Sequence, residues 1–252
     1  MGNKPGVRAG QGRMGRWLLV VWGLMALVLS GTPAMAAGPQ VTAVVAGVNS
    51  TYALLSDGTV LAWGNNFYGQ LGDGTTVSRS IPQAVPGMSH VQALVAGETS
   101  SAYALLSDGT VLVWGNNSYG QLGDGQLGYG TTASRLSPPP PQVVSGLSRV
   151  KALAAAWDTA YALLRDGTVL AWGDLSPLTP QAVGGLINVQ AIAAGGENSA
   201  YALLSDGTVL AWGIDSVSFQ YYYLPHSVLG LSHVQAIAVG GGAPTHCLAT
   251  AR

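Results

Sequence analysis

The sequence predicts an all-β protein, a β-propeller of about four to five four-stranded blades in an incomplete or open ring. Three observations predict it. A segment of 13 residues occurs four times almost unchanged, each copy contains two short apolar runs joined at Asp-Gly, and no long segment beyond residue 36 has helical periodicity. The 36 glycines and the 8% of charged residues exclude a coiled coil and a charged, disordered chain.

The repeated segment begins at a tyrosine and ends at a Trp-Gly pair. Its four copies are separated by 51, 58 and 40 residues and lie at Tyr52–Gly64, Tyr103–Gly115, Tyr161–Gly173 and Tyr201–Gly213. Both runs of each copy are apolar at nearly every position, so the sheet that they form must be covered on both faces. Small sheets stacked around an axis, as in a propeller, meet that condition.

The residues that recur once per copy are predicted to be structural. Asp-Gly favours a tight hairpin, so we interpret the turn residues as hairpin formers and not as an array of carboxylates. These residues are Asp57, Asp108, Asp166, Asp206, Gly58, Gly109, Gly167 and Gly207. One tryptophan per blade is expected to pack between neighbouring blades, which places Trp63, Trp114, Trp172 and Trp212 in the core.

Two further recurring pieces bring each unit to four strands. A Val-led apolar run precedes each Tyr-led run, and a Pro-Gln or Pro-His piece, suited to an outermost strand, precedes each Val-led run. The units then lie at about 39–64, 81–115, 140–173 and 180–213, with a partial unit at 224–250 that lacks a Trp-led strand. We therefore expect an exposed blade edge at the last unit, through which the chain self-associates.

Residues 1–36 are predicted to be a cleaved signal peptide, followed by a repeat domain at 37–252. Four basic residues precede the apolar run Trp17–Leu29, and Ala34-Met35-Ala36 offers small residues to a signal peptidase. The run is shorter than a membrane span requires, so no span is expected after cleavage; a retained anchor is the alternative. We expect a secreted, periplasmic or cell-envelope protein.

A twelve-residue motif carries a resemblance to a known family. Residues Trp63–Gly74 recur at Trp114–Gly125 with a single substitution. Together with Ala46-Gly47 and the Ser-Asp-Gly turn, this motif resembles the regulator of chromosome condensation repeat. The resemblance implies a β-propeller, usually of seven blades. It also brings two functional expectations: nucleotide exchange on a small GTPase together with chromatin docking, or, in exported bacterial relatives, inhibition of β-lactamase through one loop-rich face.

The charge balance and the predicted export both argue against the first of these functions, nucleotide exchange with chromatin docking. Beyond residue 36 the chain carries 6 Lys and Arg against 11 Asp and Glu, which argues against a nucleic-acid partner. The predicted export argues against nucleotide exchange. We therefore expect an exported, non-enzymatic module that binds a protein partner of unknown identity through its loop faces. The alternative is a structural or surface repeat component, or a degenerate fragment without a partner; an enzyme is a weaker third hypothesis.

The candidate partner-binding residues are aromatic. Phe219, Tyr221, Tyr222 and Tyr223 have no counterpart in the other units, and tyrosine-rich loops make good contact surfaces. This segment forms either such a loop or the outer strand of the last full blade.

No cofactor, metal or catalytic residue is predicted. Gly123–Gly128 matches a dinucleotide fingerprint but is followed by prolines and not by a helix. Asn65, Asn66 and Asp73 lack the spacing of a calcium loop and are interpreted as turn formers. His90 and His233 share a repeat position with Arg and Asn, and the His246-Cys247 pair cannot complete a zinc site.

Overall fold

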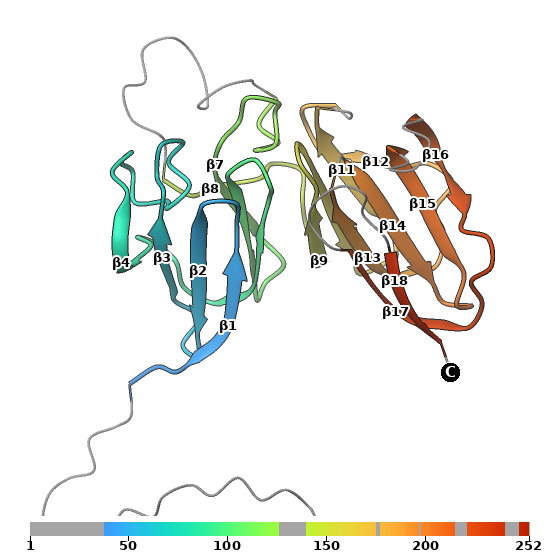
Figure 1. The fold of residues 1–252 in the computed structure, drawn as a ribbon, viewed down its shortest axis with the longest axis horizontal. Helices are drawn as coiled ribbons and strands as arrows, with labels where there is room; N and C mark the ends of the chain where they lie inside the picture. The colour runs from blue at the N-terminus through green and yellow to red at the C-terminus, as the bar shows by residue number, and fades with distance from the viewer. Residues whose placement is uncertain are drawn as a thin grey trace, which may run out of the picture. The chain divides into compact units, whose positions relative to one another are not determined.

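A computed structural model describes residues 38–125, 140–174, 177–196, 198–214, 221–239 and 247–251. Residues 38–252 form one compact unit. All regular elements of the described residues are strands, arranged in antiparallel sheets (Figure 1). In that part of the chain no helix has the length and hydropathy needed to cross a bilayer.

The strands form four four-stranded sheets and one two-stranded sheet, each built from consecutive strands. The first sheet contains β1 (Val41–Ala46), β2 (Ser50–Leu55), β3 (Val60–Gly64) and β4 (Arg79–Ala84). The second contains β5 (Val91–Ala96), β6 (Ser101–Leu106), β7 (Val111–Gly115) and β8 (Gln142–Val143). The third contains β9 (Val150–Ala155), β10 (Thr159–Leu164), β11 (Val169–Gly173) and β12 (Gln181–Ala182).

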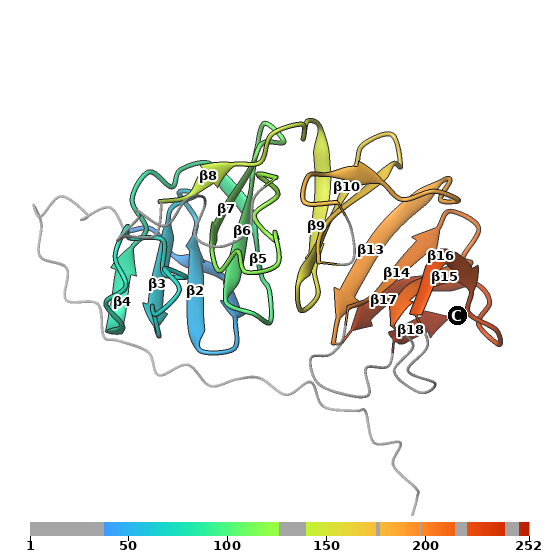
Figure 2. The same cartoon turned by 90° about the horizontal axis from the view of Figure 1, so that it is seen from above.

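The fourth sheet contains β13 (Val189–Gly195), β14 (Ser199–Leu204), β15 (Val209–Ile214) and β16 (Tyr221–Ser227). The fifth contains β17 (Val234–Val239) and β18 (Cys247–Ala251). The Val-led strands β1, β5, β9, β13 and β17 are neighbours in chain order (Figure 2). This is the blade stack of a β-propeller, as predicted. Among the described strands none of the first sheet pairs with the fifth, so no sheet closes the ring.

The phase of the repeat differs from the one expected from the sequence. Each Pro-Gln piece was expected to open a unit, at 39, 81, 140 and 180. In the structure the pieces at 81, 140 and 180 instead complete the preceding blade: β4 pairs with β3, β8 with β7 and β12 with β11. For these three pieces the role as outermost strands is confirmed. The connection from β3 to β4, residues 65–78, is longer than the connection from β4 to β5, residues 85–90, so proximity along the sequence favoured the wrong blade.

The Asp-Gly turns close the β2–β3 hairpin and its three counterparts. Gly58 N–H donates to Leu55 O over 2.9 Å, and the φ of Gly58 is +79°. In the described turn at residues 56–59, Gly58 has a positive φ and Asp57 does not. Asp57 and Gly58 therefore do not form the two-residue turn that Asp-Gly pairs favour, in which both residues have positive φ. The geometry is that of a type I turn followed by a left-handed bulge residue. Asp57 Oδ1 instead accepts from Thr59 N and Oγ1, at 3.0 and 2.7 Å.

Neighbouring blades are joined by a tryptophan of one and a tyrosine of the other. Trp114 lies edge-on to Tyr52 with ring centroids 6.0 Å apart, and its Nε1–H donates to Gln70 O over 2.8 Å. The hydroxyl of Tyr52 donates to the same carbonyl over 2.6 Å. Trp172, Tyr103 and Gln121 repeat this arrangement at the next interface, and a third edge-on pair joins Trp212 to Tyr161.

The four repeated tryptophans are not equally buried. Trp114, Trp172 and Trp212 are buried between blades, as predicted, whereas Trp63 is only partly buried. The expectation for Trp63 was wrong because the other three indoles each cover the tyrosine of the blade before them. No described residue precedes the first blade to offer Trp63 such a tyrosine.

Trp114→Ala is expected to lower the free energy of unfolding by about 3–5 kcal/mol, because it removes a buried side chain and leaves a cavity. Trp63→Ala, at the half-covered position, is expected to cost about 1 kcal/mol. Urea denaturation of both variants and of the unmodified chain measures the difference. Equal losses for the two variants would contradict the inter-blade assignment.

Gly58→Ala is expected to cost about 3 kcal/mol, because it adds a Cβ at positive φ and places that atom 2.7 Å from His90 N. Gly87→Ala is the control: its φ is +73° but nothing lies within 4 Å of the added atom, so it carries only the backbone cost of about 1 kcal/mol. Thermal denaturation compares the two, and a Gly58 variant no less stable than the Gly87 variant would refute the close approach.

Candidate functional site: the loop face

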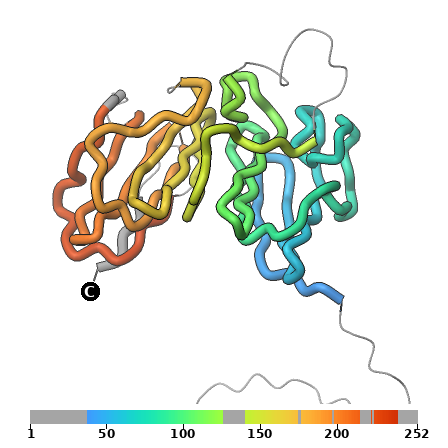
Figure 3. The backbone as a smooth tube through the Cα atoms, turned by 180° about the vertical axis from the view of Figure 1, so that it is seen from behind, coloured from blue at the N-terminus to red at the C-terminus, as the bar shows by residue number. Residues whose placement is uncertain are grey.

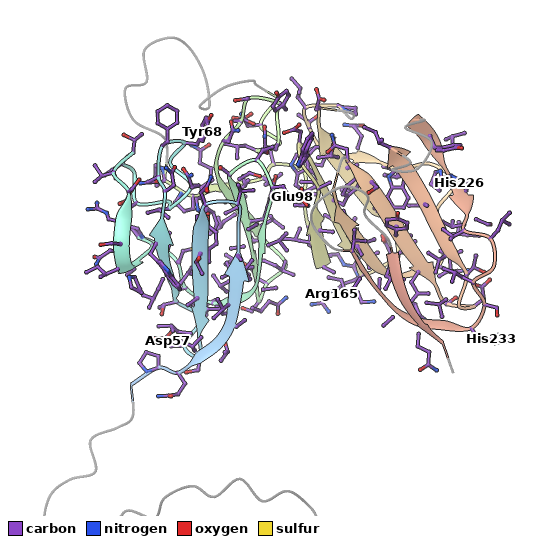
Figure 4. All side chains as sticks on the ribbon, in the orientation of Figure 1. Asp57, Tyr68, Glu98, Arg165, His226 and His233 are labelled. Atoms are coloured by element: carbon purple, nitrogen blue, oxygen red, sulfur yellow. The ribbon has the colours of Figure 1, made fainter. Side chains whose placement is uncertain are left out.

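The five sheets have two ends of different character. All Val-led strands run in one direction, so the connections that follow them gather at one end, together with the long connections that follow the Trp-led strands. We call this end the loop face. Its described segments are 47–49, 65–78, 97–100, 116–125, 140–141, 156–158, 174, 177–180, 196 and 198. Figure 4 shows Tyr68 and Glu98 at this end, and Asp57, Arg165 and His233 at the opposite end.

The opposite end, the turn face, is nearly the same in every blade. It holds the four Asp-Gly turns, in which a carboxylate accepts from the threonine two residues later and the pKa of the aspartate is held below its usual value by these bonds. The residue before β5, β9, β13 and β17 is left-handed, at His90, Arg149, Asn188 and His233 respectively. The aspartates and glycines of these turns therefore stabilise the hairpin backbone, as the sequence analysis predicted.

The loop face, in contrast, differs from blade to blade. The second residue after the Val-led strand is Val48 in the first blade, Glu98 in the second and Trp157 in the third. The connections after the Trp-led strands also differ in length and composition, as the tube in Figure 3 traces for the described residues. The residues that pack between blades, such as the repeated tyrosines and tryptophans, largely recur, so a position that changes widely in size and charge between repeats is less constrained by packing. The loop face therefore carries the variable chemistry of the chain.

Large apolar side chains are exposed on this face. Phe67 is 66% exposed, Trp157 46% and Tyr119 44%, and each lies in a loop-face connection. Phe67 also lies edge-on to Tyr68, with ring centroids 5.0 Å apart. Exposed aromatic rings held on a rigid scaffold are typical of protein contact surfaces.

Hydrogen bonds hold the connection 65–78 in one conformation. Asn66 Nδ2 donates to Asp73 Oδ1 and Thr75 O, both at 3.0 Å, while its Oδ1 accepts from Leu71 N at 2.8 Å. Asp73 forms an ion pair with Arg79 at 2.9 Å. The side-chain oxygens of Asn66 and Asp73 thus accept hydrogen bonds within the loop, which supports their interpretation as turn formers.

A cavity of about 440 Å³ opens at the centre of the loop face. Residues from the ends of β1, β5, β9, β13 and β17 and from the connections after them line it, and nearly all of these residues are Gly, Ala or Val. Glu98 is the one charged residue among the described residues of the lining. Its Oε1 accepts from Gly196 N at 3.0 Å, so the second blade is tied across this centre to the fourth.

Next to the cavity, the connection 156–158 is fixed by its neighbours. The Thr99 hydroxyl donates to Trp157 O over 2.6 Å and accepts from Gln121 Nε2 at 3.0 Å. Asp158 N–H donates to Asn198 Oδ1 over 3.0 Å, but the Asp158 side chain is buried, at 7% exposure, and its Oδ1 has no hydrogen-bond partner among the described residues. Burial raises the pKa of Asp158, Thr99 opposes that rise, and the nearby Asp174 adds to it.

Charge is distributed unevenly between the two ends. The described part of the loop face holds one guanidinium, on Arg79, and five carboxylates, on Asp73, Glu98, Asp124, Asp158 and Asp174. Arg79 is already paired with Asp73. Arg149, Lys151 and Arg165 lie toward the turn face, among its aspartates. The loop face therefore presents an excess of negative charge.

The aromatic segment singled out from the sequence lies in an edge strand. Tyr221, Tyr222 and Tyr223 begin β16, where Tyr221 pairs with Ile214 and Tyr222 with Gly213, so the outer-strand alternative describes them. Tyr222 stacks on His226 with centroids 4.3 Å apart. Phe219 lies outside the described residues. Whether this segment binds a partner stays a prediction.

The described residues contain no group of three or more His, Cys, Asp or Glu placed to hold a metal ion. Of the Gly-rich match, residues 123–125 continue the loop of the second blade, with a positive φ of 70° at Gly123 and 79° at Gly125. Residues 126–128 and His246 lie outside the described part, and Cys247 begins β18.

Comparison with known proteins agrees with this architecture. A model of the regulator of chromosome condensation (RCC1) repeat matches residues 57–104 and 108–163, and a second model of that repeat matches residues 41–70 and 91–121. The E3 ubiquitin-protein ligase HERC2 of Mus musculus is 29% identical over 151 residues, which is 58% of this chain and 3% of HERC2. The ultraviolet-B receptor UVR8 of Arabidopsis thaliana is 30% identical over 139 residues, 54% of this chain and 30% of UVR8.

Among solved structures, Prp20p from Saccharomyces cerevisiae superposes with a TM-score of 0.70 at 18% identity. The match covers 87% of this chain and 57% of Prp20p, whose structure was described with its binding to Gsp1p and histones. The chain therefore spans less than two thirds of each of these relatives. At this identity the superposition establishes the propeller fold.

Asp158→Asn is expected to stabilise the chain at neutral pH, because the buried carboxylate of Asp158 has an unpartnered oxygen. The folded-state pKa is raised, so the folded state favours the protonated form, and the stability that this preference contributes is lost as the pH rises from the ordinary value toward the raised one. The variant and the unmodified chain should thus be similarly stable below the ordinary value and diverge above it. Thermal unfolding across that range measures this; a variant less stable at pH 7 contradicts it.

Proposed function

Because the chain carries repeats of the regulator of chromosome condensation family, we propose that it is an exported, non-enzymatic propeller module that binds a partner protein through its loop face. Propellers of this family include regulators and interaction modules, and Prp20p was described with protein partners. The identity of the partner does not follow from these relatives, because the chain covers only part of each of them.

The observation that carries the proposal is the stronger sequence variation at one end of the blades. The turn face keeps the Asp-Gly-Thr turn in each of the four blades, while the loop face places Val48, Glu98 and Trp157 at equivalent positions. Phe67, Tyr119 and Trp157 add exposed rings to it. A scaffold that needs only to stack would favour repetition at both ends.

Export is the second element of the proposal. The basic, apolar and Ala-Met-Ala succession of residues 1–36 supports a cleaved signal. We expect the chain recovered from its native host to begin at Ala37 and to lie outside the cytoplasm. N-terminal sequencing of that protein tests this, and recovery from the cytosol with residues 1–36 intact would overturn it.

A structural surface component is the competing proposal, and β18 favours it. Among the described strands β18 pairs only with β17, which leaves its other side open to a strand of a second chain. Sedimentation of the dilute chain distinguishes the two proposals. A binding module remains a monomer until its partner is added, whereas an array component associates by itself.

Replacing both Phe67 and Trp157 with Ser is expected to reduce capture of the partner from the native envelope or medium by at least tenfold, by analogy with aromatic contact residues elsewhere. The matched control is Arg165→Ser on the turn face, because the other three repeats already have serine there. Capture is measured as a saturable bound fraction. Equal saturable capture by both variants would place the binding surface away from the loop face, and no saturable capture by the unmodified chain would refute the binding function.

A further inference from the structure

We propose that the central cavity of the loop face is a binding site for a cationic side chain of the partner, the ammonium of a lysine or the guanidinium of an arginine on its aliphatic stem. This proposal rests on the proposed binding function and assigns the chemistry of the contact. It identifies Glu98 as the residue that pairs with the charge and Trp157, on the corresponding connection of the next blade, as an exposed ring that adds to the attraction.

The lining of the cavity suits a long, thin, apolar stem. Its walls are the small side chains at the ends of the five Val-led strands, with Val48 and Val239 as the largest aliphatic groups. The volume, about 440 Å³, falls within the range of ligand sites, roughly 300–1,000 Å³. The methyl groups of the walls can contact an aliphatic stem, while the exposed backbone of the glycines keeps part of the wall polar.

Glu98 gives the cavity its sign. Among the described lining residues its carboxylate is the one charged group, and the bond from Gly196 N to Oε1 holds it in place across the centre. The described part of the lining contains neither lysine nor arginine to neutralise it. The one guanidinium on the described loop face, that of Arg79, is paired with Asp73, 2.9 Å away. A carboxylate beside an apolar wall favours a cation that brings its own apolar stem.

Trp157 adds a second attraction for the same charge. It stands at the repeat position that Val48 and Glu98 occupy in the cavity lining, and it is 46% exposed. The bond from the Thr99 hydroxyl to Trp157 O joins its connection to that of Glu98. An exposed indole face attracts ammonium and guanidinium groups through its quadrupole. Carboxylates at Asp124, Asp158 and Asp174 on the same face raise the local concentration of cations.

Small amines test the site without the partner. n-Butylammonium and ethylguanidinium are titrated into the full chain, and the indole fluorescence and the amide resonances of Glu98 and Gly196 are recorded. n-Butanol is the neutral control of the same shape, and butyrate is the anionic one at equal ionic strength. We expect saturable changes with both cations and none with n-butanol or butyrate.

Two variants locate the charge. Glu98→Gln is expected to weaken n-butylammonium binding at least tenfold, and Asp206→Asn, which removes one carboxylate from the turn face, is expected to leave it unchanged. Amide resonances elsewhere in the chain report whether the Glu98 variant is folded; if it is not, the Trp157→Leu variant replaces it and should weaken binding threefold or more.

Each result decides one proposal. Saturation by n-butanol equal to that by n-butylammonium, or no saturation by either cation, overturns the cation site. If this occurs while the loop-face variants still lose capture of the partner, the binding function stands and only its assigned chemistry fails. If capture does not depend on the loop face either, both proposals fail.

Discussion

The edge-on contact between a tryptophan and the tyrosine of the blade before it is the interaction on which the stack depends. Three interfaces use it, with ring centroids 5.7 to 6.3 Å apart. At two of them one backbone carbonyl, that of Gln70 or Gln121, accepts hydrogen bonds from both the indole and the phenol. These bonds tie the connection after the Trp-led strand of one blade to the tryptophan of the next blade. No disulfide is available to a chain with one cysteine, so these contacts and the apolar cores around them hold the blades together.

This arrangement separates scaffold from function. The groups that pack, turn and bond between blades recur at fixed positions, which leaves the remaining loop-face positions able to change without loss of the fold. Those positions gather the exposed rings of Phe67, Tyr119 and Trp157 and the carboxylate of Glu98. The proposed partner contact therefore lies at the loop-face positions that differ between blades. The recurring Asp-Gly turns of the turn face serve to form the hairpins.

Much of the fold could be predicted from the sequence, because most strands belong to a segment that recurs in several copies. The hairpins at Asp57 and its counterparts and the burial of Trp114, Trp172 and Trp212 follow from local residues. The sequence did not predict which blade each Pro-Gln strand belongs to, because its pattern is compatible with pairing to the strand before it or to the strand after it. The burial of Trp63 depends on a neighbouring blade, which a pattern within one repeat does not report.

The site was less predictable than the fold. Aromatic content drew attention to Tyr221–Tyr223, which lie in β16, while Phe67, Tyr119 and Trp157 are single residues within otherwise repeated segments. A comparison of the repeats position by position would have found Glu98 and Trp157. The cavity itself joins residues as far apart as Ala46 and Val239, so only the stacked blades create it.

A double-mutant cycle on Tyr103 and Trp172 measures the inter-blade contact most directly. Tyr103→Leu, Trp172→Leu and the double variant are compared with the unmodified chain by urea denaturation. A contact that holds the blades together predicts a coupling energy of about 0.5–1.5 kcal/mol from the ring pair. Losses that add to within about 0.3 kcal/mol would show that the two rings stabilise the chain independently, and would contradict the dependence of the stack on their contact.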